Sequence, residues 1–337
     1  GEALPCLYNK MMMMVVARQT RGFATTAAER VRVTMHSKHV CVVTLARPGK
    51  MNALDIPMFT AIRDAARDVA KRPEVRCVVL HGEGRGFCAG LDVKSMVTTP
   101  GAVESLMARE EGEVANLAQS VGYLWRKVPA PVIAAVHGPC FGGGFQIALG
   151  CDLRLASPDA KFSVMEAKWG LVPDMGASVT FPDAMPRDLA KDLTLTGRVF
   201  DAQEALQMRL VTRLVDGDDG DGSGVLDAAL KLASEVAARS PDSSTAAKRL
   251  IDAAYDEDDK DANRLLKLES KLQRRLLGGW NQLAASARGL SVPEILVPGF
   301  LNRSEKWSNE ADDIVEQRLQ DLLEGHSRQS VDQRRVH

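Results

Sequence analysis

The sequence predicts an α/β fold in which short apolar strands alternate with helices and pair in parallel. The runs Cys77–Leu80 and Pro131–Val136 have the continuous hydrophobicity of strands that are buried on both faces. Each run is followed by a glycine-rich turn, and the second turn leads into a helical segment and another short strand. At 337 residues the chain is long enough to bury a large core.

The N-terminal part of this pattern predicts a hairpin and then a helix. Val31–Met35 and Val40–Leu45 are rich in β-branched residues and flank the polar segment 36–39, which is typical of a β-hairpin. Asp55, with Pro57 close behind it, indicates a capped helix start. Apolar residues then recur at helical spacing until Pro73: Ile56, Phe59, Ile62, Ala66 and Val69.

The middle of the chain predicts a helix over about 102–127, a helix at Phe145–Leu149 and a strand at Leu153–Ala156. The acidic, glycine-rich stretch Asp216–Gly224 resembles a calcium loop only superficially, because an EF-hand needs glycine at its sixth position and glutamate at its twelfth. A solvated linker is the better interpretation. Segment 241–277 predicts one or two amphipathic helices, and a polar tail follows.

Composition excludes several partners at the level of the whole chain. The 43 basic and 44 acidic side chains leave a net charge of −1, so neither nucleic acid nor a membrane surface is expected as a partner. No apolar run reaches the length of a membrane span. The six cysteines are scattered, which predicts a reducing compartment and neither a disulfide framework nor a metal site.

The N-terminal residues 1–30 have the composition of a targeting segment. Residues 11–26 contain arginine, threonine and alanine, and no acidic residue occurs between Met11 and Glu29. This composition is typical of a mitochondrial transit peptide, so we expect the protein in the mitochondrial matrix. A plain N-terminal extension is the alternative.

The turns Gly84–Asp92 and Gly138–Gly144 are the first candidates for a functional site. Glycine lets the backbone approach a ligand closely and offers bare N–H groups, and a triple glycine that opens a helix places these donors at the positive end of the helix dipole. Two such turns can direct their amides at one oxygen and form an oxyanion hole. Either turn alone is more often simply a turn.

Several motifs around these turns occur in a recognisable order between residues 31 and 280. The central one comprises Pro131–Gly138 (PVIAAVHG), Gly142–Gln146 (GGGFQ) and Cys151–Arg154 (CDLR). With the earlier turn Gly86–Asp92 (GFCAGLD), it resembles the signature segments of the crotonase (enoyl-CoA hydratase/isomerase) superfamily. Flanking motifs are similar to further family segments: Leu45–Pro48 (LARP) with Asn52–Leu54 (NAL), and Leu195–Gly197 (LTG) with Ala202 and Ala205.

The resemblance implies a fold, a substrate and an assembly. A crotonase-type spiral of ββα units is expected over 31–235, a C-terminal helical trimerisation region over 236–310, and a polar tail over 311–337. The expected substrate is an acyl-CoA thioester, with coenzyme A as part of the substrate and no separate cofactor or metal. The expected assembly is a homotrimer or a hexamer built as a dimer of trimers.

The resemblance also implies roles for individual residues. The backbone amides of Leu91 and Gly143 are expected to hold the thioester oxygen. Backbone from Leu91 through Val93 is expected at the adenine end, with Lys94 and Lys50 (or Arg47) at the phosphates of coenzyme A. Other residues expected to contact the substrate are Ala89, Asp92, Gly142 and Gln146.

The reaction depends on the carboxylates beside the thioester. Hydratases of this family carry a glutamate just after the triple glycine and another about twenty residues on. This chain has Gln146 at the first position and Glu166 at the second, which weakens the case for water addition by two carboxylates. Asp174, eight residues after Glu166, resembles the acid of the dienoyl-CoA isomerase branch. Enoyl-CoA isomerases in the family can work with one glutamate at the position that matches Glu166.

Three functions therefore follow from the sequence. The leading prediction is an acyl-CoA double-bond isomerase in which Glu166 and Asp174 transfer the proton. The second is a 2-enoyl-CoA hydratase that uses Glu166, with Gln146 helping to position water. The third is a non-catalytic homologue that binds acyl-CoA or RNA. The candidate basic stripe for RNA, Lys267–Arg275, is better explained as the solvated face of a helix.

Overall fold

The computed structural model describes residues 30–215, 220–255, 261–290 and 299–304. Within them, the chain forms two sheets. In the larger sheet the first two strands are antiparallel and the others pair in parallel. Its order is β1 (Val31–Met35), β2 (Val40–Leu45), β3 (Cys77–Gly82), β4 (Val132–Val136), β6 (Leu153–Ala156) and β9 (Arg213–Leu214).

Along the chain, strands of a smaller sheet come between strands of the larger sheet and the elements that follow them. It consists of β5 (Pro139–Phe141), β7 (Lys161–Ser163) and β8 (Phe200–Asp201). The chain passes from β4 in the larger sheet to β5 in the smaller one and then into α6 (Gly143–Leu149). It repeats this path from β6 to β7 and into the 3₁₀ helix η2 (Met165–Trp169). These repeated strand–strand–helix units give the expected spiral.

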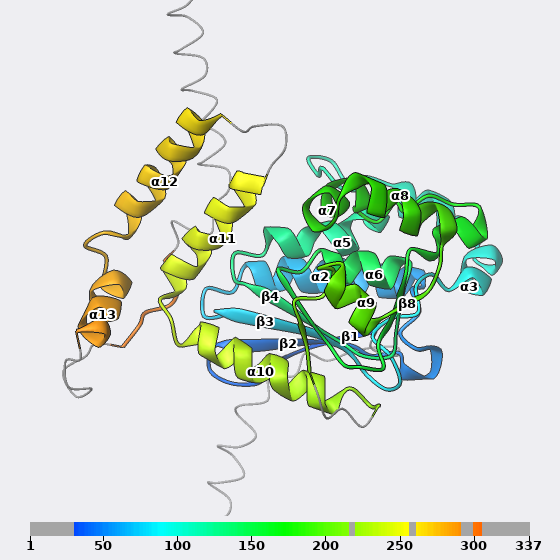
Figure 1. The fold of residues 1–337 in the computed structure, drawn as a ribbon, viewed down its shortest axis with the longest axis horizontal. Helices are drawn as coiled ribbons and strands as arrows, with labels where there is room; N and C mark the ends of the chain where they lie inside the picture. Colours follow the sequence, from blue (N-terminus) through cyan, green and yellow to red (C-terminus); the bar gives the residue numbers. More distant parts are fainter. Residues whose placement is uncertain (1–29, 216–219, 256–260, 291–298, 305–337) are drawn as a thin grey trace, which may run out of the picture.

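Helices cover both faces of the larger sheet (Figure 1). The main core lies under α2 (Ile56–Ala70), α5 (Leu117–Lys127) and α6, and it includes the buried Trp125 and Phe145. On the other face, α10 (Ser223–Ala237) packs its small side chains against β2, β3, β4 and β6. The shorter helices are η1 (Pro48–Lys50), α3 (Val93–Thr98), α4 (Ala102–Met107), α7 (Ala177–Ala184), α8 (Arg187–Thr196) and α9 (Ala202–Gln207).

The C-terminal helices α11 (Pro241–Tyr255), α12 (Ala262–Leu276) and α13 (Trp280–Gly289) extend away from the two sheets (Figure 1). They have a small apolar cluster of their own, centred on Ala246 and Leu272. Lys248 attaches α11 to the spiral, because its ammonium lies 2.8 Å from Asp152 and also donates to two main-chain carbonyls. The helical region is therefore tied to the core mainly at one edge.

Most strand and helix predictions are confirmed. The hairpin pairs Val31 with Leu45, and Asp55 caps α2 by accepting a hydrogen bond of 2.9 Å from the Met58 N–H. The predicted elements at 77–80, 131–136, 145–149 and 153–156 are all present. Segment 241–277 contains two helices, one of the two alternatives that its periodicity left open.

The predicted helix over 102–127 is wrong, because the structure has two helices there. The first ends at Met107 and the second begins after Asn116. Asn116 and Gln119 form a capping box, which starts a new helix by satisfying its first N–H groups. Gly112, with a φ of 80°, interrupts the acidic segment between them.

The predicted linker Asp216–Gly224 needs a correction at its end. Residues 216–219 lie outside the described residues, but α10 begins at Ser223 and was not predicted. The sequence pattern that indicates α10 is a four-residue repeat of small or β-branched residues, Val225, Ala229, Ala233 and Ala237. The predicted transit peptide (except Arg30) and the tail over 311–337 also lie outside the described residues.

The described part of the chain contains no helix long and apolar enough to cross a membrane. All five of its cysteines are free and buried. Burial raises the pKa of the Cys41 thiol to about 11, so this thiol behaves as a small neutral side chain.

The close contact between α5 and α6 predicts the effect of a single methyl group. A Cβ added at Gly150 would lie 1.9 Å from the main-chain oxygen of Gly122, so Gly150→Ala must separate the two helices. We expect it to lower the free energy of unfolding by about 1–3 kcal/mol or more, as overpacking does. Gly289→Ala is the control, because a Cβ there meets nothing within 4 Å. Urea unfolding measures both, and equal stabilities would contradict the prediction.

Candidate active site

The two glycine-rich turns lie against each other. Cys88 and Cys140 form a short parallel bridge, in which the Cys88 N–H donates to Pro139 and the Phe141 N–H donates to Cys88, both at 3.0 Å. Gly90 has a φ of 87°, and a Cβ there would lie 2.7 Å from the Phe141 oxygen and 3.7 Å from the Gly143 nitrogen. Only glycine fits this contact, which brings the first turn beside the first amide of α6.

The N–H groups of Leu91 and Gly143 are available as donors. Gly143 is the first residue of α6, where the helix itself offers no acceptor. Leu91 lies in a parallel bridge with Leu54, which uses the oxygen of Gly90 and the N–H of Asp92. Among the described residues, no acceptor is bonded to either of the two N–H groups. Each turn therefore carries one N–H group that has no protein acceptor among the described residues.

Glu166 lies beside the second turn. It belongs to η2 and is 8% exposed, and its Oε1 is 3.2 Å from the position of a Cβ built on Gly142. This oxygen accepts a hydrogen bond of 2.7 Å from the Gln146 Nε2. The second oxygen, Oε2, is buried and has no hydrogen-bond partner among the described residues. A carboxylate with a free oxygen therefore lies next to the paired turns.

Gln146 connects three parts of the site. It projects from α6 and is 1% exposed, and its Oε1 accepts a hydrogen bond of 2.8 Å from the N–H of Met175. The Met175 side chain in turn lies against Gly143, since its sulfur would be 2.4 Å from a Cβ there. Gln146 thus joins α6, η2 and the loop before α7. Met175 was not predicted, and the sequence carries no motif that would mark it.

Asp174 is half-buried and close enough to influence Glu166. Burial raises the pKa of Glu166 most, and the negative charge of Asp174 raises it further, against hydrogen bonds from its own backbone and from Gln146. Burial also raises the pKa of Asp174. Raised pKa values bring both carboxyl groups nearer to the pH at which a group can take up and release a proton, as acid–base transfer requires.

The residues predicted at the coenzyme A end fall into two groups. Lys50 and Lys94 are exposed near the first turn. The guanidinium of Arg47 is already paired with carboxylates of the protein, because it forms ion pairs of 2.8 Å with Asp92 and 3.3 Å with Asp55. Of the alternatives Lys50 and Arg47, Lys50 is therefore the better candidate for a phosphate.

Ala89 and Asp92 are tied to the scaffold at the same end of the site. The N–H of Ala89 donates to the oxygen of Met51. The Asp92 carboxylate also caps α3 by accepting from the Ser95 N–H, and its own N–H donates to Leu54. Val93, the first residue of α3, is half-buried. These contacts hold the segment 89–93 against the scaffold, and its predicted contact with coenzyme A stays a prediction.

The side chain of Asn52 stabilises the first turn by hydrogen bonds to main-chain oxygens. It is fully buried, and its Nδ2 lies 2.9–3.1 Å from the main-chain oxygens of Glu83, Gly86 and Phe87. Its Oδ1 accepts from the N–H of Arg47 at 2.8 Å. The sequence placed Asn52 in a motif but indicated no role for it, because its partners lie up to 35 residues away.

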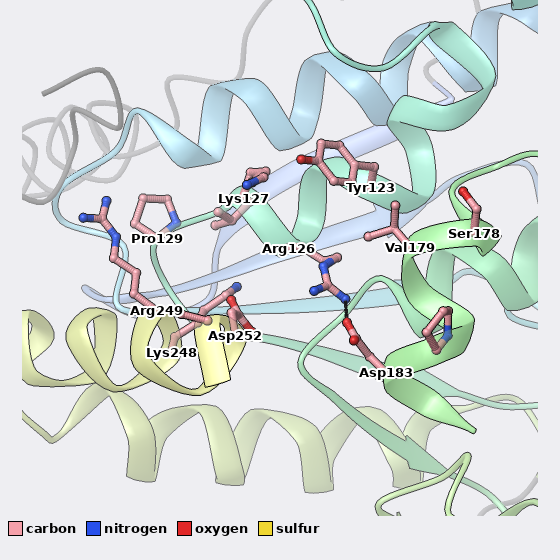
Figure 2. A pocket seen from close by; sticks show the side chains of 13 residues that line it. Tyr123, Arg126, Lys127, Pro129, Ser178, Val179, Asp183, Lys248, Arg249 and Asp252 are labelled. Atoms are coloured by element: carbon pink, nitrogen blue, oxygen red, sulfur yellow. Dashed lines mark hydrogen bonds and ion pairs between the residues drawn. The ribbon is translucent and has the colours of Figure 1, made fainter. Parts of the chain in front are cut away.

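Two cavities of about 520 and 540 Å³ lie elsewhere, between α11 and the spiral. Neither is lined by any of the predicted site residues. Figure 2 shows the first, where Arg126 from α5 pairs with Asp183 from α7 across the opening. In the described part of the chain, no three His, Cys, Asp or Glu side chains are grouped so that they could hold a metal ion.

Comparison with known proteins identifies the family of this chain. A model of the enoyl-CoA hydratase/isomerase family matches residues 35–277. The chain is 38% identical over 203 residues to an enoyl-CoA hydratase of Mycobacterium tuberculosis, covering 60% of this chain and 73% of the relative. It is 34% identical to the mitochondrial Δ(3,5)-Δ(2,4)-dienoyl-CoA isomerase of Rattus norvegicus, covering 63% and 65%.

Solved structures show the same fold. The enoyl-CoA hydratase of Mycobacterium smegmatis superposes with a TM-score of 0.67 at 27% identity, covering 78% of this chain and 96% of that one. The fold and the two paired turns define an enzyme of the crotonase superfamily. The protein belongs to the enoyl-CoA hydratase/isomerase family, as its motifs predicted.

The burial of Glu166 predicts how stability depends on pH. Since folding raises its pKa, the stability that the protonated carboxyl contributes is complete below the unfolded pKa and is lost as pH rises through the folded one. The side chain in Glu166→Gln does not titrate, so the free energy of unfolding of this variant relative to the wild type should increase as pH rises. Urea unfolding across this pH range measures the difference, with the exposed Glu235→Gln as control. Equal destabilisation at every pH would contradict the prediction.

Proposed function

We propose that the protein shifts a carbon–carbon double bond in an unsaturated acyl-CoA, with a 3-enoyl- or 3,5-dienoyl-CoA as substrate. One observation carries this choice over hydration. Of the two positions at which the family's hydratases carry glutamates, this site has a carboxylate only at Glu166, while Gln146 holds that carboxylate by a hydrogen bond of 2.7 Å. An amide cannot take up a proton, so Gln146 cannot serve as the second general base.

The proposed reaction removes a proton from one carbon of the acyl chain and adds a proton at another. Ionised Glu166 removes a proton from the carbon next to the thioester carbonyl, and the electron pair of that C–H bond moves into a conjugated enolate. The N–H groups of Leu91 and Gly143 stabilise the negative oxygen. Protonated Asp174 then delivers a proton further along the chain as the double bond takes its new position. Glu166 gains the proton that Asp174 loses, and proton exchange between them restores the site.

Hydration of a 2-enoyl-CoA is the second candidate, and the hydratase names among the relatives favour it. In that reaction Glu166 would act as the single acid–base residue and Gln146 would help to orient water. Both ends of the Gln146 amide already have protein partners, Glu166 and Met175, which limits its capacity to orient a water molecule.

A non-catalytic role in binding acyl-CoA or RNA is less well supported. The basic residues of α12 share that helix with Glu269 and with apolar residues of the C-terminal cluster. The raised pKa values of the buried Glu166 and the half-buried Asp174 favour catalysis over binding alone.

We also propose that the protein works in the mitochondrial matrix as a homotrimer or hexamer. Large apolar side chains support association through the C-terminal helices, because Ile251, Leu266, Trp280 and Leu283 are each more than half exposed. The basic N-terminal composition supports the location.

A substrate panel in deuterated water tests the proposed reaction. We expect the purified protein to convert 3-enoyl- or 3,5-dienoyl-CoA and to exchange deuterium at the carbon next to the thioester. Glu166→Gln should lower kcat/KM by about 10²–10⁴-fold, the range for loss of a general base. NMR of the products follows both bond position and exchange, and Glu235→Gln serves as the surface control.

The same panel separates the alternatives. If the protein shifts no double bond but hydrates crotonyl-CoA, and that hydration survives Asp174→Asn but not Glu166→Gln, the enzyme is a hydratase. If acyl-CoA binds without exchange or turnover, the non-catalytic interpretation replaces both.

Removal of the Asp174 charge has a predictable effect on pH dependence. The negative charge of Asp174 raises the pKa of Glu166, so Asp174→Asn should lower this pKa. The acidic limb of the kcat/KM profile for α-proton exchange should therefore move to lower pH, even though double-bond transfer slows. A limb that stays in place or moves to higher pH would show that the two carboxyl groups are not coupled in this way.

A further inference from the structure

The orientation of the Gln146 amide is determined by its two partners. A main-chain N–H can only donate, so the end of the amide that faces the Met175 N–H, at 2.8 Å, must be the oxygen. The other end is then the NH₂ group, which donates to Glu166 Oε1 at 2.7 Å. The amide therefore cannot be reversed without placing two donors against each other.

This orientation makes the two oxygens of Glu166 unequal. Oε1 is held as a hydrogen-bond acceptor, which disfavours a proton on it. Oε2 is buried and has no partner among the described residues. We propose that Gln146 is a positioning residue that leaves Glu166 Oε2 as the atom that takes the proton from the substrate and carries it. This inference rests on the isomerisation proposed above and assigns its proton-accepting atom.

The same amide also places the second carboxyl group. Met175 directly follows Asp174, so the hydrogen bond from its N–H to Gln146 fixes the backbone at the point where Asp174 leaves it. Gln146 is buried on α6 between the two segments. A single neutral side chain thus sets the positions of both proton-transfer groups relative to the amides of the second turn.

Few charges act on Glu166. Asp174, on the loop before α7, is the titratable group whose charge bears on it among the described residues, and α6 presents only the neutral Gln146. Since the hydrogen bond from Gln146 lowers the pKa of Glu166, its removal should raise that pKa and delay ionisation to higher pH.

Two variants of Gln146 test the proposal. Gln146→Leu removes the donor and the acceptor, while Gln146→Glu keeps the shape and can still accept from the Met175 N–H, so it should fold if the leucine variant does not. In Gln146→Glu the two carboxyl groups would lie about 2.7 Å apart, as the amide and Glu166 do now, and would share a proton, which adds a second ionisation step.

Asn281 offers a matched control. It is a buried amide that donates to Asp242 at 3.1 Å and accepts from the Leu301 N–H at 2.8 Å, the same bridging pattern in the C-terminal helices. Asn281→Leu should therefore cost stability in a similar way and leave the ionisation of Glu166 unchanged. It separates the general effect of losing a buried bridge from an effect on the carboxyl.

Two measurements read the outcome. The first is kcat/KM for isomerisation against pH, where both Gln146 variants should lose about 10- to 100-fold and show an acidic limb at higher pH. The second is the C=O stretch of protonated Glu166 in infrared difference spectra, assigned by its loss in Glu166→Gln and titrated without substrate. It should disappear at higher pH in both variants than in the wild type and Asn281→Leu.

The result that overturns the proposal is a folded Gln146 variant in which the infrared titration and the acidic limb match the wild type. Failure of the proposed function gives a different experimental result. If the wild type shifts no double bond, only the kinetic measurement is lost, and the infrared titration still decides whether Gln146 controls Glu166.

Discussion

The contact between the two glycine-rich turns is the constraint on which the rest of the site depends. Because Gly90 lies against the Phe141 oxygen and the Gly143 amide, any side chain at residue 90 would push the turns apart. The bridge between Cys88 and Cys140 fixes their register. The relative positions of the two turns, and of the N–H groups of Leu91 and Gly143 that they carry, follow from this contact.

Burial of Glu166 and Asp174 opposes stability and supports chemistry. Burial removes part of the water that would solvate an ionised carboxylate, so the pKa values of both groups rise. A raised pKa brings each group nearer to the pH at which it can both take and release a proton. The buried amide of Gln146 limits the cost, because it offers one strong hydrogen bond to the charged form without adding a second charge.

The sequence predicted those features that depend on local pattern. The strands, the Asp55 cap and the motifs of the two turns all follow from residues close together in the chain. The prediction of one helix over 102–127 failed because it passed over the polar segment 109–113 with Gly112, and because the second helix starts at a capping box that Asn116 and Gln119 form. The bridge through Gln146 was not predictable, since its partners lie 20 and 29 residues away and one of them is a main-chain N–H.

An amide at residue 146 also has consequences for the choice of reaction. Addition of water across a double bond needs one group to activate water and another to protonate carbon, whereas movement of a double bond needs a proton to leave and return. With Gln146 in place, Glu166 has one oxygen occupied and one without a partner among the described residues, which suits Glu166 as the group that takes a proton from one carbon while Asp174 supplies a proton at another. A carboxylate at residue 146 would place two like charges side by side, and one of them would have to stay protonated.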